Sequence, residues 1–536
     1  MTLHYSLRTF LPGILLFLLS LGTVLTKSNS LRAQTEQDYV DYYDKNEKHK
    51  RSEGKYKNGN EHGTWQFWYK NGQLKEYAEF VKGYRHGKNA TYYENGNREF
   101  LGFFDYDRRD SIYKAWYKNG NLKEEGQYVY NLRHGTWKYY YENGDLRKVE
   151  QADSGLIRLE KLVSPKGEVW VENGEGTIKY FHDNGKLKER ARIKNGRRNG
   201  EAAYFFETGE KAIDAFYKNG KKSNQWIHYY PQGDTHQVIH YNQNRKEGEY
   251  TAYFPNGQVD KNGPYHNDMR NGKWEWFYND GQKAQTGYYE NDLQSKNWKV
   301  YYPNGKLDET GDYLNNEKHG FWEMYYEDGQ LQSKGEFRKG EKHGDWKTYY
   351  TNGQVWTEGT FNEGLETGLW KAYHKNGKLE SKGEFEAGKM HGDWKSWYQS
   401  GQIRYTGQMD HGLKTGEWEY YYENGKLREK GAYQNGLKHG CRQVYNPTGI
   451  LYSDGCYDEG LKTGTWIFNY KTGQKQREEE YKKNRLHGTS KSWHQGMQLR
   501  SEREYKNGRL HGTFKQYDKR GNVVVEARYK NGVKVD

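Results

Sequence analysis

Aromatic and polar residues follow one another in short runs along this chain, and the same pattern returns with a period of about 24 residues. In residues 320–343, an aromatic-rich run covers 321–326, Glu-Asp-Gly occupies 327–329, and a second run covers 330–337. Short runs rich in Tyr, Phe and Trp and bounded by turn residues are typical of β-strands. Residues 338–343 are predicted to form a second turn that leads to the next unit. Each unit is therefore predicted to be one β-hairpin.

Glycine marks this period. Lys296 and Asn224 fill the slot where glycine is missing, and Ser111 does so in a separate N-terminal series. A fixed period of this length predicts a repeat architecture in which no unit buries its apolar surface alone. The glycines of the long series are Gly176, Gly200, Gly248, Gly272, Gly320, Gly344, Gly368, Gly392, Gly416, Gly440, Gly464, Gly488 and Gly512.

Both faces of the predicted strands carry aromatic side chains. In Tyr325 and Tyr326, as in Tyr349 and Tyr350, neighbouring residues point to opposite faces of a strand. No apolar stripe with helical spacing could supply a covering helix. The predicted fold is all-β: an elongated single-layer antiparallel sheet, or solenoid, of about twenty 24-residue hairpins. Rings are expected to pack on rings of the next strand or on its glycines, which are Gly287, Gly311, Gly335, Gly359, Gly383, Gly407, Gly431 and Gly455.

Proline refines the prediction for the first turn of the unit. Pro255 and Pro303 each stand two residues before the turn glycine. A type I turn followed by a left-handed glycine accepts proline at that place, because the turn already requires a φ near that of proline. We therefore expect this turn, with its bulge, at least in those repeats.

The period breaks once, because the glycine spacing between Gly135 and Gly176 is shorter than two full periods. The predicted organisation follows from this break and from the atypical ends of the chain. It consists of a signal peptide over 1–33, a degenerate capping hairpin over 34–62, an N-terminal array over 63–155, a shortened repeat or hinge over 156–175, and a C-terminal array over 176–536.

The N-terminus has the pattern of a secretory leader. Arg8 precedes the apolar run 11–25, and small and polar residues lead to Ala33. This arrangement predicts a signal peptide cleaved after Ala33 and a periplasmic or extracellular protein. The alternative is an uncleaved leader that anchors the chain in the membrane. No cysteine stands near the cut, so a lipoprotein is not expected.

The composition and net charge of the chain limit the classes of partner that can be expected. Hydrophobic residues make up only 33% of the chain, but aromatic residues reach 17%, which together with the strict period argues against disorder. The net charge is +13, with Lys and Glu alternating through the repeats and no dense basic block. Charge spread in this way keeps a sheet soluble, and nucleic acid is not expected as a partner.

Two segments carry a family resemblance. Residues 335–346, Gly-Glu-Phe-Arg-Lys-Gly-Glu-Lys-His-Gly-Asp-Trp, resemble the MORN repeat, whose pattern is roughly Gly-x-aromatic-x-x-Gly-x-x-His-Gly-x-aromatic. Residues 418–431 resemble the variant MORN repeat of bacterial proteins labelled as YwqK-type antitoxin components. The resemblance covers about residues 39–536 and implies a scaffold, a protein-binding surface or a membrane-associated module. The antitoxin label implies a protein that neutralises a partner toxin.

Candidate chemistry is sparse. Histidine recurs in the second turn, but equivalent turns lie two strands apart, roughly 9–10 Å, and no cysteine accompanies them at zinc spacing. This favours a structural role, so no metal and no cofactor is expected. No nucleophile–base pair, phosphate loop or paired-acid motif stands out, so a non-enzymatic protein without catalytic residues is predicted. The histidines are His62, His86, His134, His319, His343, His391, His439, His487 and His511.

The two cysteines, Cys441 and Cys456, flank the turn that contains Pro447. In the register of a two-residue loop they face each other, close enough for a disulfide. In the bulged register that Pro447 favours they are expected to be displaced by one residue and to point to opposite faces. The sequence leaves both alternatives open.

The predicted function is a scaffold that binds a protein partner at the bacterial cell envelope through an aromatic-rich sheet surface. The alternatives are glycan or peptidoglycan binding, association with a lipid surface, and antitoxin-like neutralisation of a toxin. The candidate binding residues are Trp322, Trp346, Trp370, Trp394 and Trp418.

Overall fold

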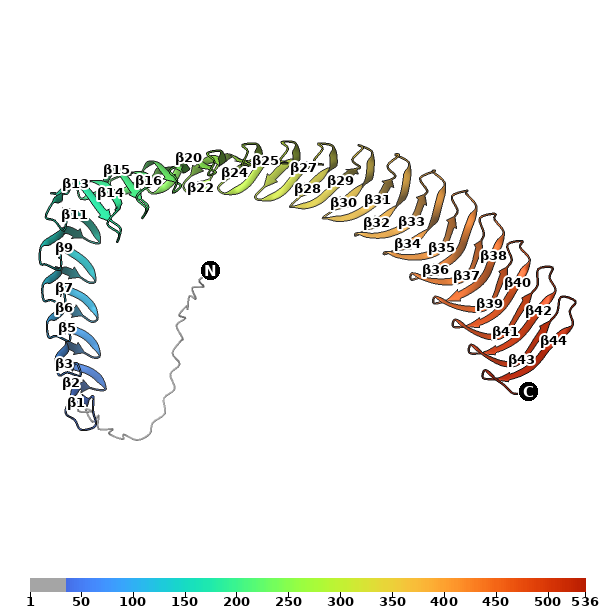
Figure 1. The fold of residues 1–536 in the computed structure, drawn as a ribbon, viewed down its shortest axis with the longest axis horizontal. Coiled ribbons are helices and arrows are strands. Elements are labelled where there is room, and N and C mark those ends of the chain that lie inside the picture. The colour runs from blue at the N-terminus through green and yellow to red at the C-terminus, as the bar shows by residue number, and fades with distance from the viewer. Residues whose placement is uncertain (1–34) are drawn as a thin grey trace, which may run out of the picture. The chain divides into compact units, whose positions relative to one another are not determined.

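The structure is a computed structural model that describes residues 35–536. The predicted leader, 1–33, lies outside the described residues. Over the described range the chain contains 45 strands and no helix, and consecutive strands lie side by side as antiparallel neighbours (Figure 1). The predicted all-β single-layer sheet of hairpins is confirmed.

The chain divides into two compact units. The first contains residues up to 176 together with 195–197, and the second contains 177–194 and 198–536. In the shortened segment, β11 is followed by the four-residue β12, and that segment's role as a hinge stays a prediction. The strands before the division are β1(Glu36–Tyr42), β2(Lys50–Lys57), β3(Asn60–Trp68), β4(Leu74–Val81), β5(Tyr84–Tyr92), β6(Arg98–Asp105), β7(Arg108–Trp116), β8(Leu122–Val129), β9(Leu132–Tyr140), β10(Leu146–Asp153), β11(Leu156–Val163) and β12(Val169–Glu172), and β13(Glu175–Phe181) crosses it.

The strands of the second unit alternate between about eight and nine residues, with short pieces where a bulge divides a strand. They are β14(Leu187–Lys194), β15(Arg197–Phe205), β16(Lys211–Lys218), β17(Lys221–Lys222), β18(Asn224–Tyr229), β19(Thr235–Asn242), β20(Arg245–Tyr253), β21(Val259–His266), β22(Met269–Arg270), β23(Gly272–Phe277), β24(Lys283–Glu290), β25(Leu293–Tyr301), β26(Leu307–Leu314), β27(Glu317–Tyr325), β28(Leu331–Arg338), β29(Glu341–Tyr349), β30(Val355–Asn362), β31(Leu365–Tyr373), β32(Leu379–Glu386), β33(Lys389–Trp397), β34(Ile403–Asp410), β35(Leu413–Tyr421), β36(Leu427–Gln434), β37(Leu437–Tyr445), β38(Leu451–Asp458), β39(Leu461–Asn469), β40(Lys475–Lys482), β41(Arg485–Trp493), β42(Leu499–Lys506), β43(Arg509–Tyr517), β44(Val523–Lys530) and β45(Val533–Lys534).

The first turn of the unit has the predicted type. In the repeat of Pro255, Gly257 N–H donates to Phe254 O at 2.9 Å and Gly257 has a φ of +83°. The repeat that carries Gly329 closes in the same way, with a bond of 2.7 Å from its N–H to Tyr326 O. Type I turns ending in a left-handed glycine are therefore confirmed.

The predicted second turn, residues 338–343, is wrong in extent. Only Lys339 and Gly340 form the turn, with φ of +52° and +79°, and β29 begins at Glu341. Two left-handed residues make a type I′ turn, whose twist matches that of the flanking strands. The strand can start early because Gly344, at φ +67°, lies in a β-bulge inside it.

The bulge explains the periodic glycine series. Where glycine is missing, Ser111, Asn224 and Lys296 adopt the same left-handed conformation, with φ of +61°, +55° and +56°. Left-handed backbone costs an L-residue about 1–2 kcal/mol, so glycine is the residue that this bulge favours. The glycines thus recur with this period because each repeat contains one such bulge.

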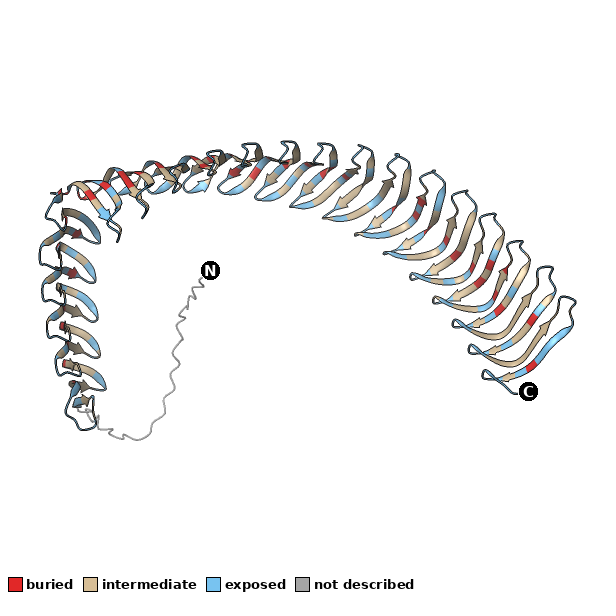
Figure 2. Cartoon of the chain, viewed as in Figure 1, coloured by how far each residue is buried: buried red, intermediate tan, exposed pale blue. Residues whose placement is uncertain are grey.

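The two faces of the sheet differ. On one face the buried tryptophan ring of most repeats lies over a glycine of the preceding strand: a Cβ on Gly335 would come within 2.4 Å of the Trp346 ring. On the other face Glu358 pairs with Lys347 at 3.0 Å and Lys371 at 3.1 Å. Buried residues accordingly occur as short bands on the strands, repeat after repeat (Figure 2).

Both edges of the sheet are tied from repeat to repeat. At the type I turns, Tyr326 Oη donates to Tyr349 O at 2.8 Å, and Tyr350 does the same to Tyr373 O at 2.9 Å. At the type I′ turns, Gly340 N–H donates to Lys318 O at 3.0 Å. These bonds satisfy polar groups that a meander of separate hairpins would leave to water.

Candidate functional site

The five predicted binding tryptophans form one row on the second unit. Trp346 lies edge-on between Phe337 and Phe361, with ring centroids 5.1 and 6.1 Å apart. Its Nε1–H donates to Glu336 O at 3.0 Å. Trp322, Trp370 and Trp394 continue the same alternation of Trp and Phe rings. The sheet thus joins Trp322, Trp346, Trp370 and Trp394 in one ladder of rings, which Met409 interrupts before Trp418.

The row is buried rather than displayed on the surface, and its role in binding stays a prediction. Trp322, Trp346 and Trp418 are only 1%, 2% and 3% exposed, Trp394 is also buried, and Trp370 is half-buried. Neighbouring rings cover each edge, and a lysine stem covers the open face, as with Lys342 Nζ 4.4 Å from the Trp346 centroid. The row is the core of the repeats, and so the exposed aromatic surface that the glycan alternative needs is not found there.

At the type I′ edge of the second unit, a row of aliphatic side chains is exposed. Leu413, Leu437 and Leu461, here called the leucine row, each follow a type I′ turn in three successive repeats and are 50%, 51% and 37% exposed. The Leu413 methyl lies 3.4 Å from the place where a Cβ on Gly436 would stand, so each leucine extends toward the next turn. Sequence inspection missed this row, although its spacing of one repeat period was available as a signal.

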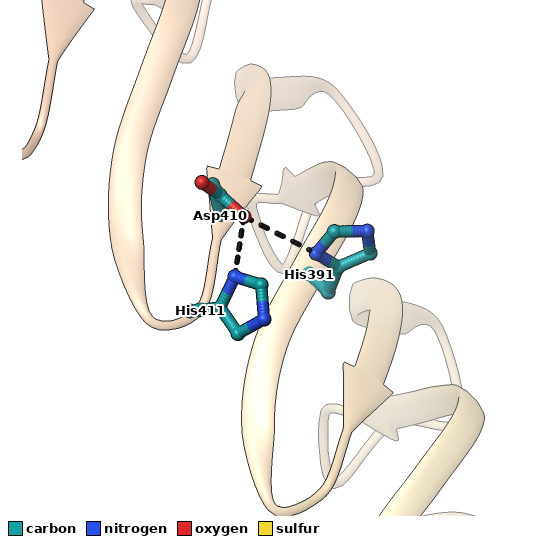
Figure 3. A group of neighbouring side chains, drawn as sticks. All are labelled: His391, Asp410 and His411. Carbon is teal, nitrogen blue, oxygen red and sulfur yellow. Dashed lines mark hydrogen bonds and ion pairs between the residues drawn. The ribbon is translucent and has the colours of Figure 1, made fainter.

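Histidines gather at one point of the same edge. His391 Nδ1 lies 3.6 Å from Asp410 Oδ1, and His411 Nδ1 lies 2.6 Å from that oxygen (Figure 3). The ligand atoms of the three residues lie within 4.8 Å of one another, an arrangement that could hold a metal ion. His411 was not among the histidines singled out from the sequence.

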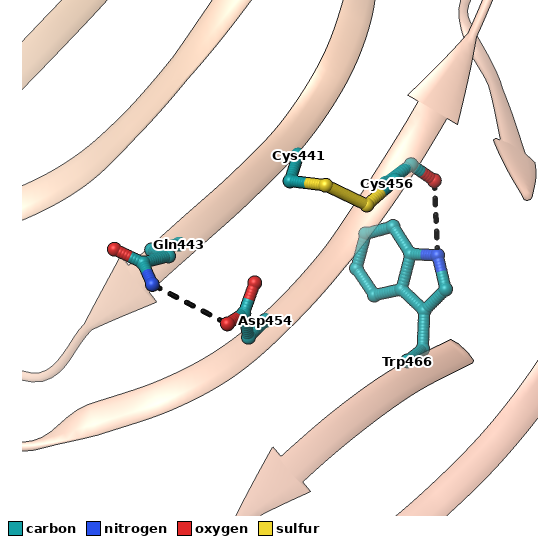
Figure 4. The surroundings of a disulfide bond; sticks show 5 residues. All are labelled: Cys441, Gln443, Asp454, Cys456 and Trp466. Carbon is teal, nitrogen blue, oxygen red and sulfur yellow. Dashed lines mark hydrogen bonds between the residues drawn. A yellow bond between two sulfur atoms is a disulfide. The ribbon is translucent and has the colours of Figure 1, made fainter. Parts of the chain in front are cut away.

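Cys441 and Cys456 form a disulfide across β37 and β38 (Figure 4). The bulged register was expected to displace them, and that expectation is wrong. A second bulge at Tyr452 shifts the register again between Val444 and Tyr445, so the cysteines stand directly opposite each other. Trp466 Nε1–H donates to Cys456 O at 3.1 Å on the neighbouring strand.

The residue next to the disulfide replaces a tryptophan. Arg442 occupies the ring slot over Gly431 and is 3% exposed. Its guanidinium pairs with Glu429, donates to Tyr433 Oη at 3.0 Å and lies 4.8 Å from the centre of that ring. Neutralisation by Glu429 is what allows a charge at this buried position.

Turns, ladders and bulges that recur once in every repeat define a β-hairpin solenoid. The family model of the MORN repeat variant matches more than half of the chain, and the chain belongs to this family. The YwqK-type label is not confirmed. The matched residues are 61–82, 109–130, 133–151, 174–195, 246–267, 270–291, 295–315, 318–339, 342–363, 366–387, 390–411, 414–435, 462–483 and 510–531.

Other comparisons add little. No curated protein matches the chain. Among solved structures, TcdB2-TccC3-Cdc42 is 12% identical over 87% of this chain, with a TM-score of 0.14. The Photorhabdus luminescens Tc holotoxin pore is also 12% identical over 87% of this chain, with a TM-score of 0.12. The chain spans only 27% and 28% of those two chains.

Residues 35–536 include no helix long and apolar enough to cross a membrane.

Proposed function

We propose that this protein is a non-enzymatic repeat scaffold that binds a protein partner at the bacterial cell envelope. The observation that carries the proposal is the leucine row, an ordered series of exposed apolar side chains at equivalent positions of successive repeats along one edge of the sheet. Successive leucines stand two strands, roughly 9–10 Å, apart, and the turn bonds hold that spacing. A row of this kind suits a partner with apolar side chains on an extended surface.

The charged residues around the leucine row indicate which kind of partner surface would fit it. Asp410 and Asp458 end the strands that precede the turns of Leu413 and Leu461, Glu459 lies in the second of these turns, and the two aspartates are exposed by more than half. The lysines that follow the leucines, such as Lys414 and Lys462, are turned toward the tryptophans and tyrosines instead. The rim is therefore acidic, and it complements a partner whose apolar patch is bordered by basic residues.

The test is a cross-linking pull-down from the envelope fraction with the full-length chain. Wild type is expected to retain a protein that can be purified and rebound, and the double variant Leu413→Asp/Leu437→Asp is expected to lose it. The matched control is Ile403→Asp/Trp356→Asp, which changes two exposed residues near the opposite turns and should keep binding. Equal binding by both double variants, or recovery of polysaccharide alone, would contradict the proposal.

Export is a separate part of the proposal, supported by Arg8, the apolar run 11–25 and the small residues before Gln34. Intact-mass measurement of the protein from envelope fractions is expected to give a chain that begins at Gln34. A mass that retains residues 1–33 would replace the exported form with the anchored one.

A further inference from the structure

Three side chains with metal-binding atoms meet at the type I′ edge of the second unit. His391 comes from β33, Asp410 ends β34, and His411 lies in the turn between β34 and β35 (Figure 3). His391 Nδ1 is buried and neither accepts nor donates a hydrogen bond. Its neighbours are Asp410 Oδ1 at 3.6 Å and Glu386 Oε2 at 3.8 Å, both beyond hydrogen-bond distance.

These distances suit a cation with tetrahedral coordination. Zinc binds histidine nitrogen and carboxylate oxygen at about 2.0–2.2 Å, which places neighbouring ligand atoms about 3.3 Å apart. The two measured separations from Asp410 Oδ1, 3.6 Å to His391 and 2.6 Å to His411, lie on either side of that value. The largest separation in the group, up to 4.8 Å, closes by rotation of exposed side chains.

Comparison with the equivalent positions in other repeats shows which feature is found only in the group of His391, Asp410 and His411. His439 and Asp458 approach each other in the same way, with Nδ1 and Oδ1 3.7 Å apart, but Glu459 stands where His411 does. His343 also has a buried Nδ1 without a hydrogen bond, so that feature belongs to the repeat. The second histidine belongs to this one site.

The fold does not require histidine at 411. The residue has a φ of +47° in a two-residue turn, a place where asparagine is the side chain best tolerated. Asn435 and Asn507 hold the equivalent position in other repeats, with φ of +50° and +52°. Likewise Thr367 and Thr415 hold the slot of His391. The backbone therefore does not require either of the two imidazoles that meet the carboxylate at this point.

We propose that His391, Asp410 and His411 bind Zn²⁺, with Glu386 as the fourth ligand. Two neutral imidazoles and two carboxylates give a donor set whose charge of −2 balances the ion, and none of the four is a soft sulfur ligand. Bound zinc joins the end of β32 to the turn after β34, one repeat further along. This proposal does not depend on the scaffold proposal, because it concerns the ion alone.

The experiment is calorimetric titration of the metal-free full-length chain with Zn²⁺, followed by Co²⁺ absorption as a probe of tetrahedral geometry. Wild type is expected to bind one zinc ion per chain at this site. His411→Asn and His391→Thr install residues that the chain itself uses in those slots, so folding should be retained. Each is expected to weaken zinc binding by at least about tenfold and to abolish the tetrahedral Co²⁺ spectrum.

A transfer of the site gives the converse test. Gln434→Glu/Glu459→His reproduces the four donors around His439 and Asp458, and is expected to raise the stoichiometry by one. Unchanged affinity in His411→Asn and His391→Thr, or no binding by wild type at micromolar zinc, would overturn the proposal. A transferred site that gains no ion, in a chain with an unchanged circular dichroism spectrum, would overturn it as well.

Discussion

Two hairpins of the second unit share the same backbone conformation but differ in the side chains that they bury. In β29–β30 the slot between strands holds Trp346, a ring without charge that lies over Gly335. In β37–β38 the same slot holds Arg442 over Gly431, and the pair of strands is joined by Cys441 and Cys456. The family model matches the units on both sides of the second hairpin, 414–435 and 462–483, but not the unit between them.

The comparison shows which properties a side chain needs in order to occupy the position over the glycine, as distinct from the residue type that is usually found there. It requires a long, flat side chain that can cover a bare glycine and contact rings on both sides, which a guanidinium satisfies as well as an indole. An indole fills the slot with apolar area alone, whereas Arg442 needs Glu429 and Tyr433 as partners. The disulfide adds a constraint that the regular hairpins lack.

The largest expected effect comes from removing the ring in the regular hairpin. Trp346→Ala is expected to destabilise β28–β30 by about 3–5 kcal/mol, because both the buried area and the ring contacts are lost. Hydrogen exchange of the amides in those strands measures this local loss. Trp356→Ala, at an exposed ring on β30, is the control and should change protection little.

Reduction of the disulfide tests the irregular hairpin. The bond joins cysteines separated by 15 positions in the sequence, so its loss is expected to cost about 3 kcal/mol through the entropy of the unfolded segment. Exchange in β37–β38 should rise on reduction, while β29–β30 stays unchanged. Equal protection of β37–β38 with and without reductant would show that Arg442 and its partners suffice.

Glycine-to-alanine substitution compares the two slots directly. A Cβ at Gly335 would stand 2.4 Å from a rigid indole, but at Gly431 it would stand 3.0 Å from Cβ and Cγ of Arg442 and 3.2 Å from its Cα, a smaller overlap. Gly335→Ala is therefore expected to cost about 1–3 kcal/mol and Gly431→Ala clearly less. Thermal unfolding with hydrogen exchange distinguishes them, and the reverse order would refute the packing argument.

The bulge offers a smaller comparison between a regular repeat and an exception. Lys296 holds a left-handed φ of +56° where Gly344 holds +67°. Lys296→Gly is expected to stabilise β25 by up to about 1 kcal/mol, since the strain of a side chain in that region outweighs the added freedom of glycine in the unfolded chain. Gly344→Lys should destabilise β29, and urea titration followed by exchange detects both.

The last prediction concerns stability in acid, on the face of the sheet opposite the tryptophans. The hydrogen bond from Tyr373, together with those from Lys347 and Lys371, lowers the pKa of Glu358 to about 2, against desolvation that raises it. A lowered folded pKa means that the stabilisation is present above the unfolded value of 4.5 and is lost as pH falls toward 2. Glu358→Gln should flatten the pH dependence of β30 protection over that range.

Much of the fold could be predicted because the same residue pattern occurs in many repeats, so that a feature of one unit can be checked in the others. Hairpins, the type I turn and the glycines beneath the rings followed from periodicity and residue type. The burial of Trp346 did not, because it depends on Phe337 and Phe361 from the two neighbouring strands and on Lys342, which the bulge in the same strand brings over the ring. The disulfide register likewise depended on a second bulge, at Tyr452, that leaves no distinctive residue in the sequence.

The tyrosine bonds between type I turns give the array a direction. Each donor lies in one repeat and its acceptor in the next, as from Tyr470 to Trp493 O, whereas His494 Nε2 in the following repeat has no hydrogen-bond partner. The tie at the type I turns is therefore missing at His494, while the bonds at the type I′ turns continue, as from Gly532 N–H to Leu510 O, so the type I turns after Tyr470 should fray more readily than those before it. Under load, each unit that opens would release up to roughly 80 Å of extended chain.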